Sequence, residues 1–294
     1  MRKAVLIPLF LLAGLAQAPA QDAEWQRQVA SGLGKTGTAM PGGVYRVGLP
    51  RTDLKVSLDG VELKPGFAFG SWLAFKRMDN EAVAMGDLVL TDAEINPVMM
   101  RLAQAGIEIT AVHNHLLRGS PNTMYMHVLG HGDPGKLAEG FRHALEASGT
   151  PFATGAPAAG EPAIELDTSA IDSAIGRKGK ASGGVYQFSV PRAQPVHEHG
   201  MEVPEAMGSA IAINFQPTGG GKAAITGDFV LTADEVNPVL RALRQHGIEV
   251  TALHSHMLGE EPRLFFMHFW ANDDAVKLAR GLRAALDEAK VSKG

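Results

Sequence analysis

The sequence predicts an α+β fold made of two similar units, and three observations support this prediction. Strings of residues in the first half recur in the second half. Within each half, alternating apolar segments of strand length are mixed with segments that carry helix start and stop signals. A stretch rich in glycine, alanine and proline, Gly149 to Pro162, lies between the halves and is typical of a linker. We therefore expect one unit over 21–148 and a second over 163–294, joined by a linker over 149–162.

The internal repeat is clearest in the middle of each half. Three strings of the first copy are GDLVLT at 86–91, EINPV at 94–98 and GIEITA at 106–111. Their counterparts are GDFVLT at 227–232, EVNPV at 235–239 and GIEVTA at 247–252. Recurrence at a fixed spacing indicates a duplicated structural unit, so both halves should share one fold.

The pattern of apolar residues and turn signals predicts the elements of the first unit. The expected strands cover 44–49, 55–58, 71–75, 82–90, 108–117 and 123–129, and the expected helices cover 23–33, 97–105 and 133–148. Asn96 before Pro97 marks one start of the central helix, but Thr91 to Glu94 form a competing capping box. The later part reads strand, helix, strand, strand, helix, which is most of a ferredoxin-like unit. The remaining strand comes from an earlier hairpin or from the other copy.

The amino-terminal segment predicts export. Arg2 and Lys3 precede an uncharged apolar run over 4–15, and the small residues Ala18 and Ala20 follow it. This order is typical of a secretory signal peptide over 1–20, with cleavage after Ala20. The apolar run is short for a bilayer span, and no second one follows, so we expect no integral membrane segment after cleavage. These features predict a soluble periplasmic or secreted protein.

The composition excludes several kinds of chemistry. There is no cysteine, which rules out disulfides, thiolate metal ligands, cysteine nucleophiles and a lipidated cysteine anchor. The formal net charge is −4, with no basic patch of the kind that binds nucleic acid. Because the chain has no disulfides, it must be stabilised by a conventional apolar core.

Histidines recur at matching positions in both copies: His113, His115 and His127 in the first, and His254, His256 and His268 in the second. Residues two apart on a strand point to one face, so His113 and His115 project together. If the following turn centres on Ser120, His113 lies directly opposite His127. Cross-strand Cβ atoms are about 5 Å apart and diagonal ones about 7 Å. The spacing thus predicts that each trio converges on one small site.

Three converging imidazoles are a suitable ligand set for a metal ion, with nitrogens about 2.0–2.1 Å from it. Imidazole-only sites suit zinc, copper, nickel and iron, and we expect a divalent transition metal, zinc or copper first. A metal ion or a small molecule is therefore the expected partner. The alternative is a hydrogen-bonded structural cluster, because duplication copies a structural cluster as faithfully as a ligand set.

Other residues have simpler explanations. Glu94 and Glu235 fit helix capping better than acid–base catalysis, and Arg51 and Arg192 fit structural ion pairs. Asp87 and Asp228 are expected to be metal ligands or residues of a turn or strand start. Met126, Met267 and Trp72 are expected to fill cores. His131 is expected to lie behind the metal ligands or at the surface, and His197-Glu198-His199 to form a solvated loop.

Several of these strings together resemble the bacterial LppY/LpqO family, a domain of unknown function named after lipoproteins. They are GVY at 43–45, PRTDL at 50–54, GDLVL at 86–90, EINPV at 94–98, AVHNH at 111–115 and MH at 126–127. The resemblance covers nearly the whole mature chain as two tandem copies, and it implies an envelope or secreted location. It implies no established activity.

Three functions remain open from the sequence. The first is an extracytoplasmic protein that binds a metal ion or small ligand through one or both histidine trios. The second is a metal-dependent hydrolase or lyase, in which an open coordination position activates water. The third is a non-enzymatic binding or scaffolding module of the envelope, in which the histidines are structural. No obvious general base stands beside the histidines, so whether the protein is an enzyme stays open.

Overall fold

The computed structural model describes residues 18–152 and 163–293, and its two halves contain matching six-stranded antiparallel sheets. The first sheet has the order β1 (Thr38–Met40), β2 (Val44–Pro50), β5 (Gly70–Met78), β6 (Glu81–Thr91), β8 (Thr123–Gly132), β7 (Glu108–His113). The second has the order β9 (Lys180–Ser182), β10 (Val185–Val190), β13 (Ile211–Gly219), β14 (Lys222–Leu231), β17 (Phe265–Asp274), β15 (Glu249–His254). The two orders correspond strand for strand, which confirms the predicted α+β fold with a duplicated antiparallel sheet.

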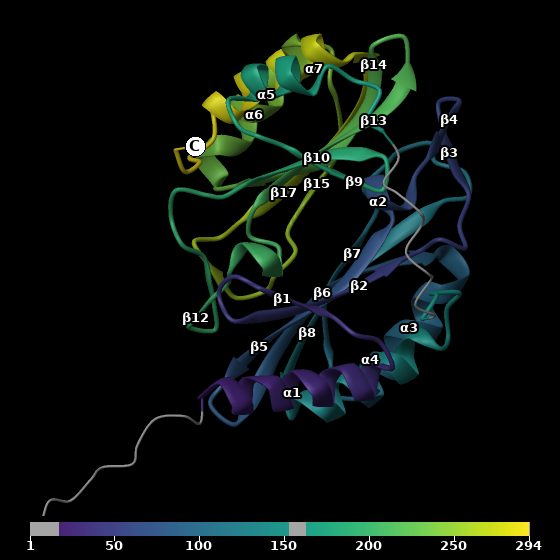
Figure 1. Ribbon diagram of the computed structural model, residues 1–294, viewed down its shortest axis with the longest axis vertical. Helices are drawn as coiled ribbons and strands as arrows, with labels where there is room; N and C mark the ends of the chain where they lie inside the picture. Colours follow the sequence, from purple (N-terminus) through teal and green to yellow (C-terminus); the bar gives the residue numbers. More distant parts are fainter. Residues whose placement is uncertain (1–17, 153–162, 294) are drawn as a thin grey trace, which may run out of the picture.

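The two sheets face each other, and helices cover the outer face of each one (Figure 1). The first sheet carries α1 (Ala18–Leu33), α3 (Asp92–Gln104) and α4 (Pro134–Leu145), and the second carries α5 (Thr168–Ile175), α6 (Ala233–Gln245) and α7 (Ala275–Asp287). Apolar residues of the strands pack beneath these helices, as where Phe75 meets Phe141 edge to face at 6.0 Å between ring centroids. Among the described residues, no helix has the length and apolar character needed to cross a membrane.

The central helix of each unit begins at the capping box and not at the proline. The Thr91 side chain accepts from the backbone N–H of Glu94, and the Glu94 carboxylate accepts from the backbone N–H of Thr91. Helix α3 therefore starts at Asp92 and includes Pro97, so the predicted start at Pro97 is wrong. The capping box satisfies free donors at the helix start, whereas Pro97 removes only one later hydrogen bond. Helix α6 repeats this arrangement with Thr232, Glu235 and Pro238.

The sequence order β6, α3, β7, β8, α4 confirms the predicted strand, helix, strand, strand, helix series. Strand β5 pairs with the free edge of β6, so the remaining strand comes from an earlier hairpin, an arrangement compatible with a ferredoxin-like core. The strand predicted over 108–117 ends at His113. The residues that follow leave the sheet, and Ser120 among them pairs through backbone hydrogen bonds with Ser57, which lies in a separate small hairpin. Most of the predicted signal peptide, 1–20, lies outside the described residues, and so does most of the predicted linker, 149–162.

Each unit sends a short excursion across to the other unit's sheet. In the first unit this segment is β3 (Val56–Leu58), β4 (Val61–Leu63) and α2 (Pro65–Ala68). The backbone N–H of Lys64 donates to Gln216 Oε1 at 2.8 Å, and Asn214 donates to the carbonyl of Phe67 at 3.2 Å. In the opposite direction, Lys76 donates to the carbonyl of Glu202 at 3.0 Å. These contacts hold the inner faces of the two sheets together.

The excursion of the second unit contains β11 (His197–Glu198), β12 (Met201–Glu202) and the 3₁₀ turn Glu205–Met207. Strand β11 also pairs with β16 (Glu260–Glu261), and Glu198 is only 2% exposed. The prediction of a solvated loop at 197–199 is therefore wrong for Glu198. Its carboxylate accepts the backbone N–H of Gly259, and this pairing draws the segment into a small sheet.

Candidate metal centre between the two sheets

The strand register places the histidines on the inner faces of the sheets. His127 on β8 lies opposite Asp87 on one side and Ala111 on the other, while His113 lies opposite Tyr125. The predicted direct pairing of His113 with His127 is therefore wrong by two residues. An offset of two keeps the same face of the strand, so the histidines still project together. The second unit has the same register, with His268 opposite Asp228 and Ala252.

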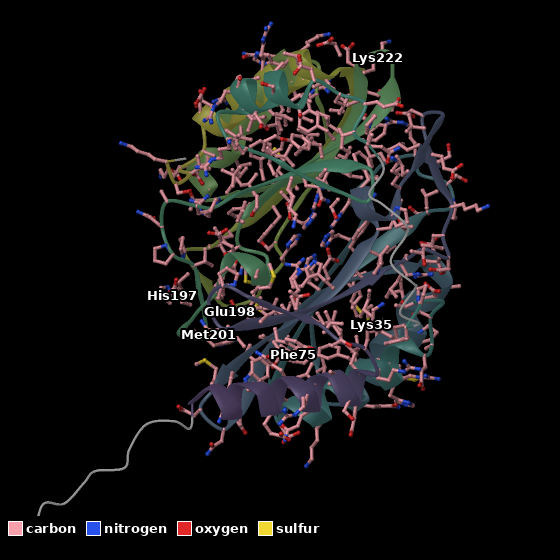
Figure 2. The ribbon with its side chains drawn as sticks, viewed as in Figure 1. Lys35, Phe75, His197, Glu198, Met201 and Lys222 are labelled. Carbon is pink, nitrogen blue, oxygen red and sulfur yellow. The ribbon has the colours of Figure 1, made fainter. Side chains whose placement is uncertain are left out.

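Within each unit, the ring of the first histidine lies close to the rings of the other two. The ring centroid of His113 lies 5.1 Å from that of His115 and 5.0 Å from that of His127. The matching distances from His254 are 5.0 Å to His256 and 4.9 Å to His268. Figure 2 shows nitrogen-bearing side chains gathered in the middle of the molecule, between the sheets. The three imidazoles of the second unit converge as the sequence predicts, whereas in the first unit the ligand nitrogen of His127 groups with the ligand atoms of Asp87 and His115 and not with that of His113.

The two trios stack on each other, which the sequence did not indicate. The stacked ring pairs, with their centroid distances, are His113–His254 at 3.5 Å, His115–His268 at 3.7 Å and His127–His256 at 3.6 Å. These pairings exchange equivalent positions of the two copies, so the units are related by an approximate two-fold axis that passes between His113 and His254. The two predicted clusters are consequently one cluster of six histidines, which we call the histidine centre.

The Nε2 atoms of the histidine centre approach each other closely. They are 3.1 Å apart for His113 and His115, 3.0 Å for His254 and His256, and 3.2 Å for His254 and His268. The ligand nitrogens of five of these histidines, all except His127, lie within 4.8 Å of one another. Two nitrogens on one tetrahedral ion at 2.0–2.1 Å are separated by about 3.3 Å, so these distances suit a common ion.

Hydrogen bonding alone satisfies these nitrogens poorly. An imidazole nitrogen carries one proton or one lone pair, but not both. His254 Nε2 faces two other Nε2 atoms, so a single proton or lone pair would have to serve both contacts. His268 Nδ1 lies 3.0 Å from the carbonyl oxygen of Gly227, which can only accept. In the neutral ring the Nε2 of His268 is therefore left with its lone pair, the form that binds a metal.

Contacts between the units hold the backbone of two of the histidines. The Thr110 hydroxyl donates to the carbonyl of His256 at 2.6 Å, and the Thr251 hydroxyl donates to the carbonyl of His115 at 2.6 Å. Within the first unit, Tyr125 stacks on His115, with 3.4 Å between ring centroids. Because the two threonine bonds run in opposite directions across the interface, each unit orients a histidine of the other.

Two aspartates lie beside the histidine centre. Asp87 Oδ1 is 3.8 Å from His127 Nε2, and Asp228 Oδ1 is 3.7 Å from His268 Nε2. Both aspartates stand in the middle of strands, so the turn role considered for them is wrong. Among the described residues, neither Oδ1 atom has a hydrogen-bond partner, and neither does His127 Nε2. Buried polar atoms without partners are rare and are explained by a bound ion or water. Strand alternation across GDLVL and GDFVL could have placed these aspartates on the histidine face.

Burial holds the whole centre close to neutral. Desolvation lowers the pKa of His113 to about 3 and that of His254 to about 4, with the charge of His254 also acting on His113. The pKa values of the other four histidines lie well below 6.5, mainly through burial. Burial raises the pKa of Asp87 to about 7 and that of Asp228 well above its usual range. The imidazoles are therefore in the neutral state that coordinates metals.

We expect the metal-free protein to lose stability as the pH falls from about 6.5 towards 4. In this window the unfolded chain protonates its histidines, whereas the folded chain does not, so the free energy of unfolding falls by about 1.4 kcal/mol per pH unit for each net proton. The two aspartates act in the opposite direction, because the folded state protonates them first. Six histidines against two aspartates leave a net loss. Urea unfolding at pH 7.5, 6.0 and 5.0 measures it, and constant stability would contradict the buried neutral centre.

The other candidate residues are structural, with one exception. Arg51 is buried and pairs with Glu94 and Asp53, and Arg192 pairs with Glu235, as predicted. Met126 and Met267 lie in the cores beneath the helices, and His131 is exposed beside Glu81, also as predicted. Trp72 is the exception, because it is only partly buried and lines a cavity.

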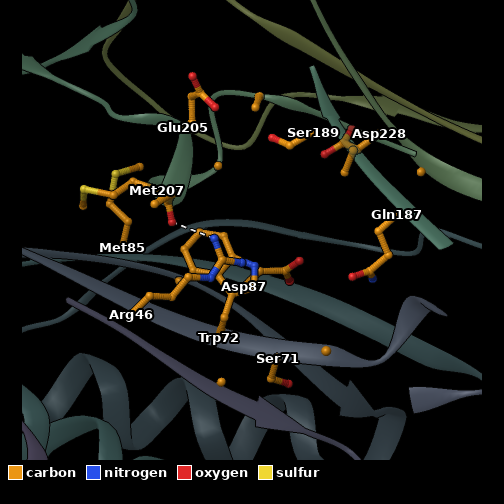
Figure 3. Close-up of a pocket in the computed structure, with 18 of the residues that line it drawn as sticks. Arg46, Ser71, Trp72, Met85, Asp87, Gln187, Ser189, Glu205, Met207 and Asp228 are labelled. Carbon is orange, nitrogen blue, oxygen red and sulfur yellow. Dashed lines mark hydrogen bonds between the residues drawn. The ribbon is translucent and has the colours of Figure 1, made fainter. Parts of the chain in front are cut away.

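This cavity lies between the sheets and has a volume of about 1250 Å³. The histidine centre contributes His115, His127, His256 and His268 to its wall, together with both aspartates. Figure 3 shows Asp87 and Asp228 at the cavity, with Arg46 and Trp72 beside Asp87. The histidine centre is therefore accessible to a small molecule from one side.

Comparison with known proteins gives a family but no activity. Among solved structures, the chain is similar to a trimeric bacterial microcompartment shell protein, PduB, with 13% identity, 86% of this chain and 89% of that chain covered, and a TM-score of 0.22. It is also similar to EtuB from Clostridium kluyveri, with 10% identity, 85% and 90% covered, and a TM-score of 0.20. No curated protein matches the chain.

A family model described as "Domain of Unknown Function (DUF1259)" matches residues 27–147 and again residues 169–288. These two matches cover most of the chain, and each spans one of the two structural copies described above. The chain belongs to this family of domains of unknown function, of which it contains two in tandem.

Proposed function

We propose that this protein binds one divalent transition-metal ion at the histidine centre, through imidazoles of both units. The observation that carries the proposal is the grouping of five histidine nitrogens, contributed by both copies, within 4.8 Å of one another. Opposite ligands of an octahedral ion with bonds of about 2.1 Å are separated by about 4.2 Å, so small side-chain movements suffice to close the site.

Three features favour an ion over a purely structural cluster. The Nε2 contacts of His254 exceed what one proton or lone pair can satisfy. The Nδ1 proton of His268 is committed to Gly227, which presents the lone pair of Nε2 to the centre. Finally, Asp87 and Asp228 each have a buried oxygen without a hydrogen-bond partner among the described residues beside the site, and a bound dication would favour the ionised form of both carboxyl groups. A dication compensates both carboxylates and all the lone pairs at once.

The donor set narrows the choice of metal. Neutral imidazoles with a nearby carboxylate suit zinc, copper, nickel or iron, whereas calcium and magnesium prefer oxygen ligands. One ion per chain is the stoichiometry that we propose, since the grouped nitrogens come from both copies and all lie within 4.8 Å of one another. The metal would polarise a ligand bound in the adjacent cavity.

The proposal predicts about one transition-metal ion per chain in protein purified without an affinity tag. Elemental analysis measures this content directly. After treatment with a chelator, added Zn²⁺ or Cu²⁺ should raise the melting temperature in proportion to the logarithm of free metal over its dissociation constant. Mg²⁺ is the matched control, since it binds imidazole weakly. If the purified protein holds no metal and neither ion changes its melting temperature, the histidine centre is structural.

We also propose that the protein is a member of the LppY/LpqO type and acts outside the cytoplasm. The support is the set of strings quoted above and the signal-peptide pattern of residues 1–20. An extracytoplasmic site built from histidine and aspartate, without cysteine, is insensitive to thiol oxidation, which is consistent with that location.

A further inference from the structure

The cavity beside the histidine centre is asymmetric, although two copies of one unit form it. In the first unit, Arg46 follows Val44 and Tyr45 on β2, and in the second unit Gln187 holds the equivalent position on β10. Trp72 lies opposite Asp87 in the sheet, whereas the residue opposite Asp228 is Ala212. The first unit therefore presents a cation and a large aromatic ring where the second presents an amide and a methyl group.

Arg46 is placed to hold an anion in this cavity. Its guanidinium lies 4.1 Å from the centroid of the Trp72 ring, and it donates one hydrogen bond, of 2.6 Å, to the carbonyl of Ala206. A guanidinium has five N–H donors in a planar fork that matches a carboxylate. The described residues provide no ion pair within 4.0 Å of Arg46. Burial lowers its pKa to about 10, with Asp87 acting against this, so it stays charged at neutral pH.

The surroundings of Arg46 are apolar on one side and polar on the other. Met85 and Met207 lie near Arg46 and Trp72, and Gln187 and Asp228 lie across the cavity (Figure 3). Both methionines are buried, at 7% and 1% exposure. The other cations that line the cavity, Lys178 and Lys180, are exposed to solvent. Among the described residues that line the cavity, Arg46 is therefore the only half-buried Lys or Arg side chain. It lies next to an apolar surface made by the Trp72 ring and the two methionine side chains.

We propose that the cavity binds a small organic acid whose carboxylate pairs with Arg46, whose apolar part packs on Trp72, Met85 and Met207, and whose far end reaches the histidine centre. The volume of about 1250 Å³ accommodates such a molecule with water. The inference deepens the proposed function by naming the ligand class that shares the cavity with the metal. It rests on that function only for the contact at the far end, because Arg46 binds the carboxylate whether or not metal is present.

Calorimetric titration of chelator-treated protein with hexanoate, and with the uncharged hexanamide, tests the proposal. Wild type should bind hexanoate at least about tenfold more tightly than the amide, the factor expected of a charge-assisted bidentate pair. Arg46→Gln, which installs the residue of the second copy, should reduce this preference to within about twofold. Arg46→Lys should keep part of it, because a lysine retains the charge but not the fork. Arg77→Gln, with the same loss of charge outside this cavity, should behave as wild type.

Melting temperatures establish that each variant is folded. If Arg46→Gln does not fold, the inference is tested by Arg46→Lys, which should lose part of the preference for hexanoate over hexanamide. Absence of hexanoate binding to wild type, or a preference for hexanoate that survives in Arg46→Gln, would overturn the inference. Repeating the titration with Zn²⁺ separates the two proposals. If hexanoate binds only when Zn²⁺ is present and ignores Arg46, the carboxylate sits on the ion, so the metal proposal stands and this inference fails. If hexanoate binding requires Arg46 but no metal binds, this inference stands and the metal proposal fails.

Discussion

Replacing His254 by alanine is expected to remove bound metal from the whole chain, even though the trio of the first unit remains intact. His254 contacts two other Nε2 atoms and stacks on His113, so it belongs to the coordination geometry of both units. Loss of one ligand-orienting neighbour already reduces metal affinity by about 10- to 100-fold, and loss of a direct ligand should exceed this. The metal content should fall from about one ion per chain to near zero. His113→Ala should have the same effect, by the approximate symmetry.

His131→Ala and His143→Ala are the matched controls, because both histidines are exposed and lie away from the centre. Elemental analysis and metal titration of the four variants, with circular dichroism to verify folding, complete the test. A chain with His254→Ala that retains half of its metal would indicate two independent sites, one per unit, and would contradict the shared centre. Unchanged metal content in both His113→Ala and His254→Ala would place the metal elsewhere.

The second large effect is expected in stability, from the buried ion pair between Arg192 and Glu235. Both side chains are only 2% exposed, and Arg192 Nη1 donates to Glu235 Oε2 at 2.8 Å. Removing one partner of such a pair leaves a buried charge uncompensated and costs about 3–5 kcal/mol. In Glu235→Ala, the bond to the carbonyl of Val230 is the only one that the guanidinium keeps among the described residues, and the capping box of α6 is lost as well.

The first copy supplies an internal comparison. Glu94→Ala removes the equivalent carboxylate, but Arg51 there retains a second partner, Asp53, through two hydrogen bonds of 2.8 and 2.9 Å. The loss in the free energy of unfolding should therefore be smaller for Glu94→Ala than for Glu235→Ala. Urea unfolding of both variants measures the difference, with the exposed residue Asp287 changed to alanine as a control of small effect. Equal losses would show that Asp53 does not compensate the buried charge.

The sequence predicted those parts of the fold that depend on local rules. The duplication and the α+β class followed from recurring strings and alternation, and the capping box at Thr91 was recognised as one of two competing helix starts. It also identified the inward face of the strands, since a period of two residues holds however the hairpin is offset. The predicted register between His113 and His127 was wrong by two residues, because β7 ends at His113 and the loop that follows pairs with another hairpin through Ser57 and Ser120, which is a tertiary contact.

The candidate site was predicted in its components but not in its assembly. The six histidines were identified by their recurrence, and Asp87 and Asp228 were considered without being placed beside them. Trp72 was assigned to a core because its alternation matches an apolar strand, yet it lines the cavity under Arg46. A period of two says which face a residue occupies, but not whether that face meets another sheet or encloses a space.

The sequence by itself thus determined that this protein has two copies of one α+β unit, each with three histidines on one face of a sheet. Only the tertiary structure decided that the two faces meet, so that two trios form one histidine centre beside a single asymmetric cavity. The physical reason is distance along the chain. The contacts that align the trios join residues about 140 positions apart, such as Thr110 with His256 and Thr251 with His115. Alternation, capping and turn signals act over a few residues and carry no information about such pairs.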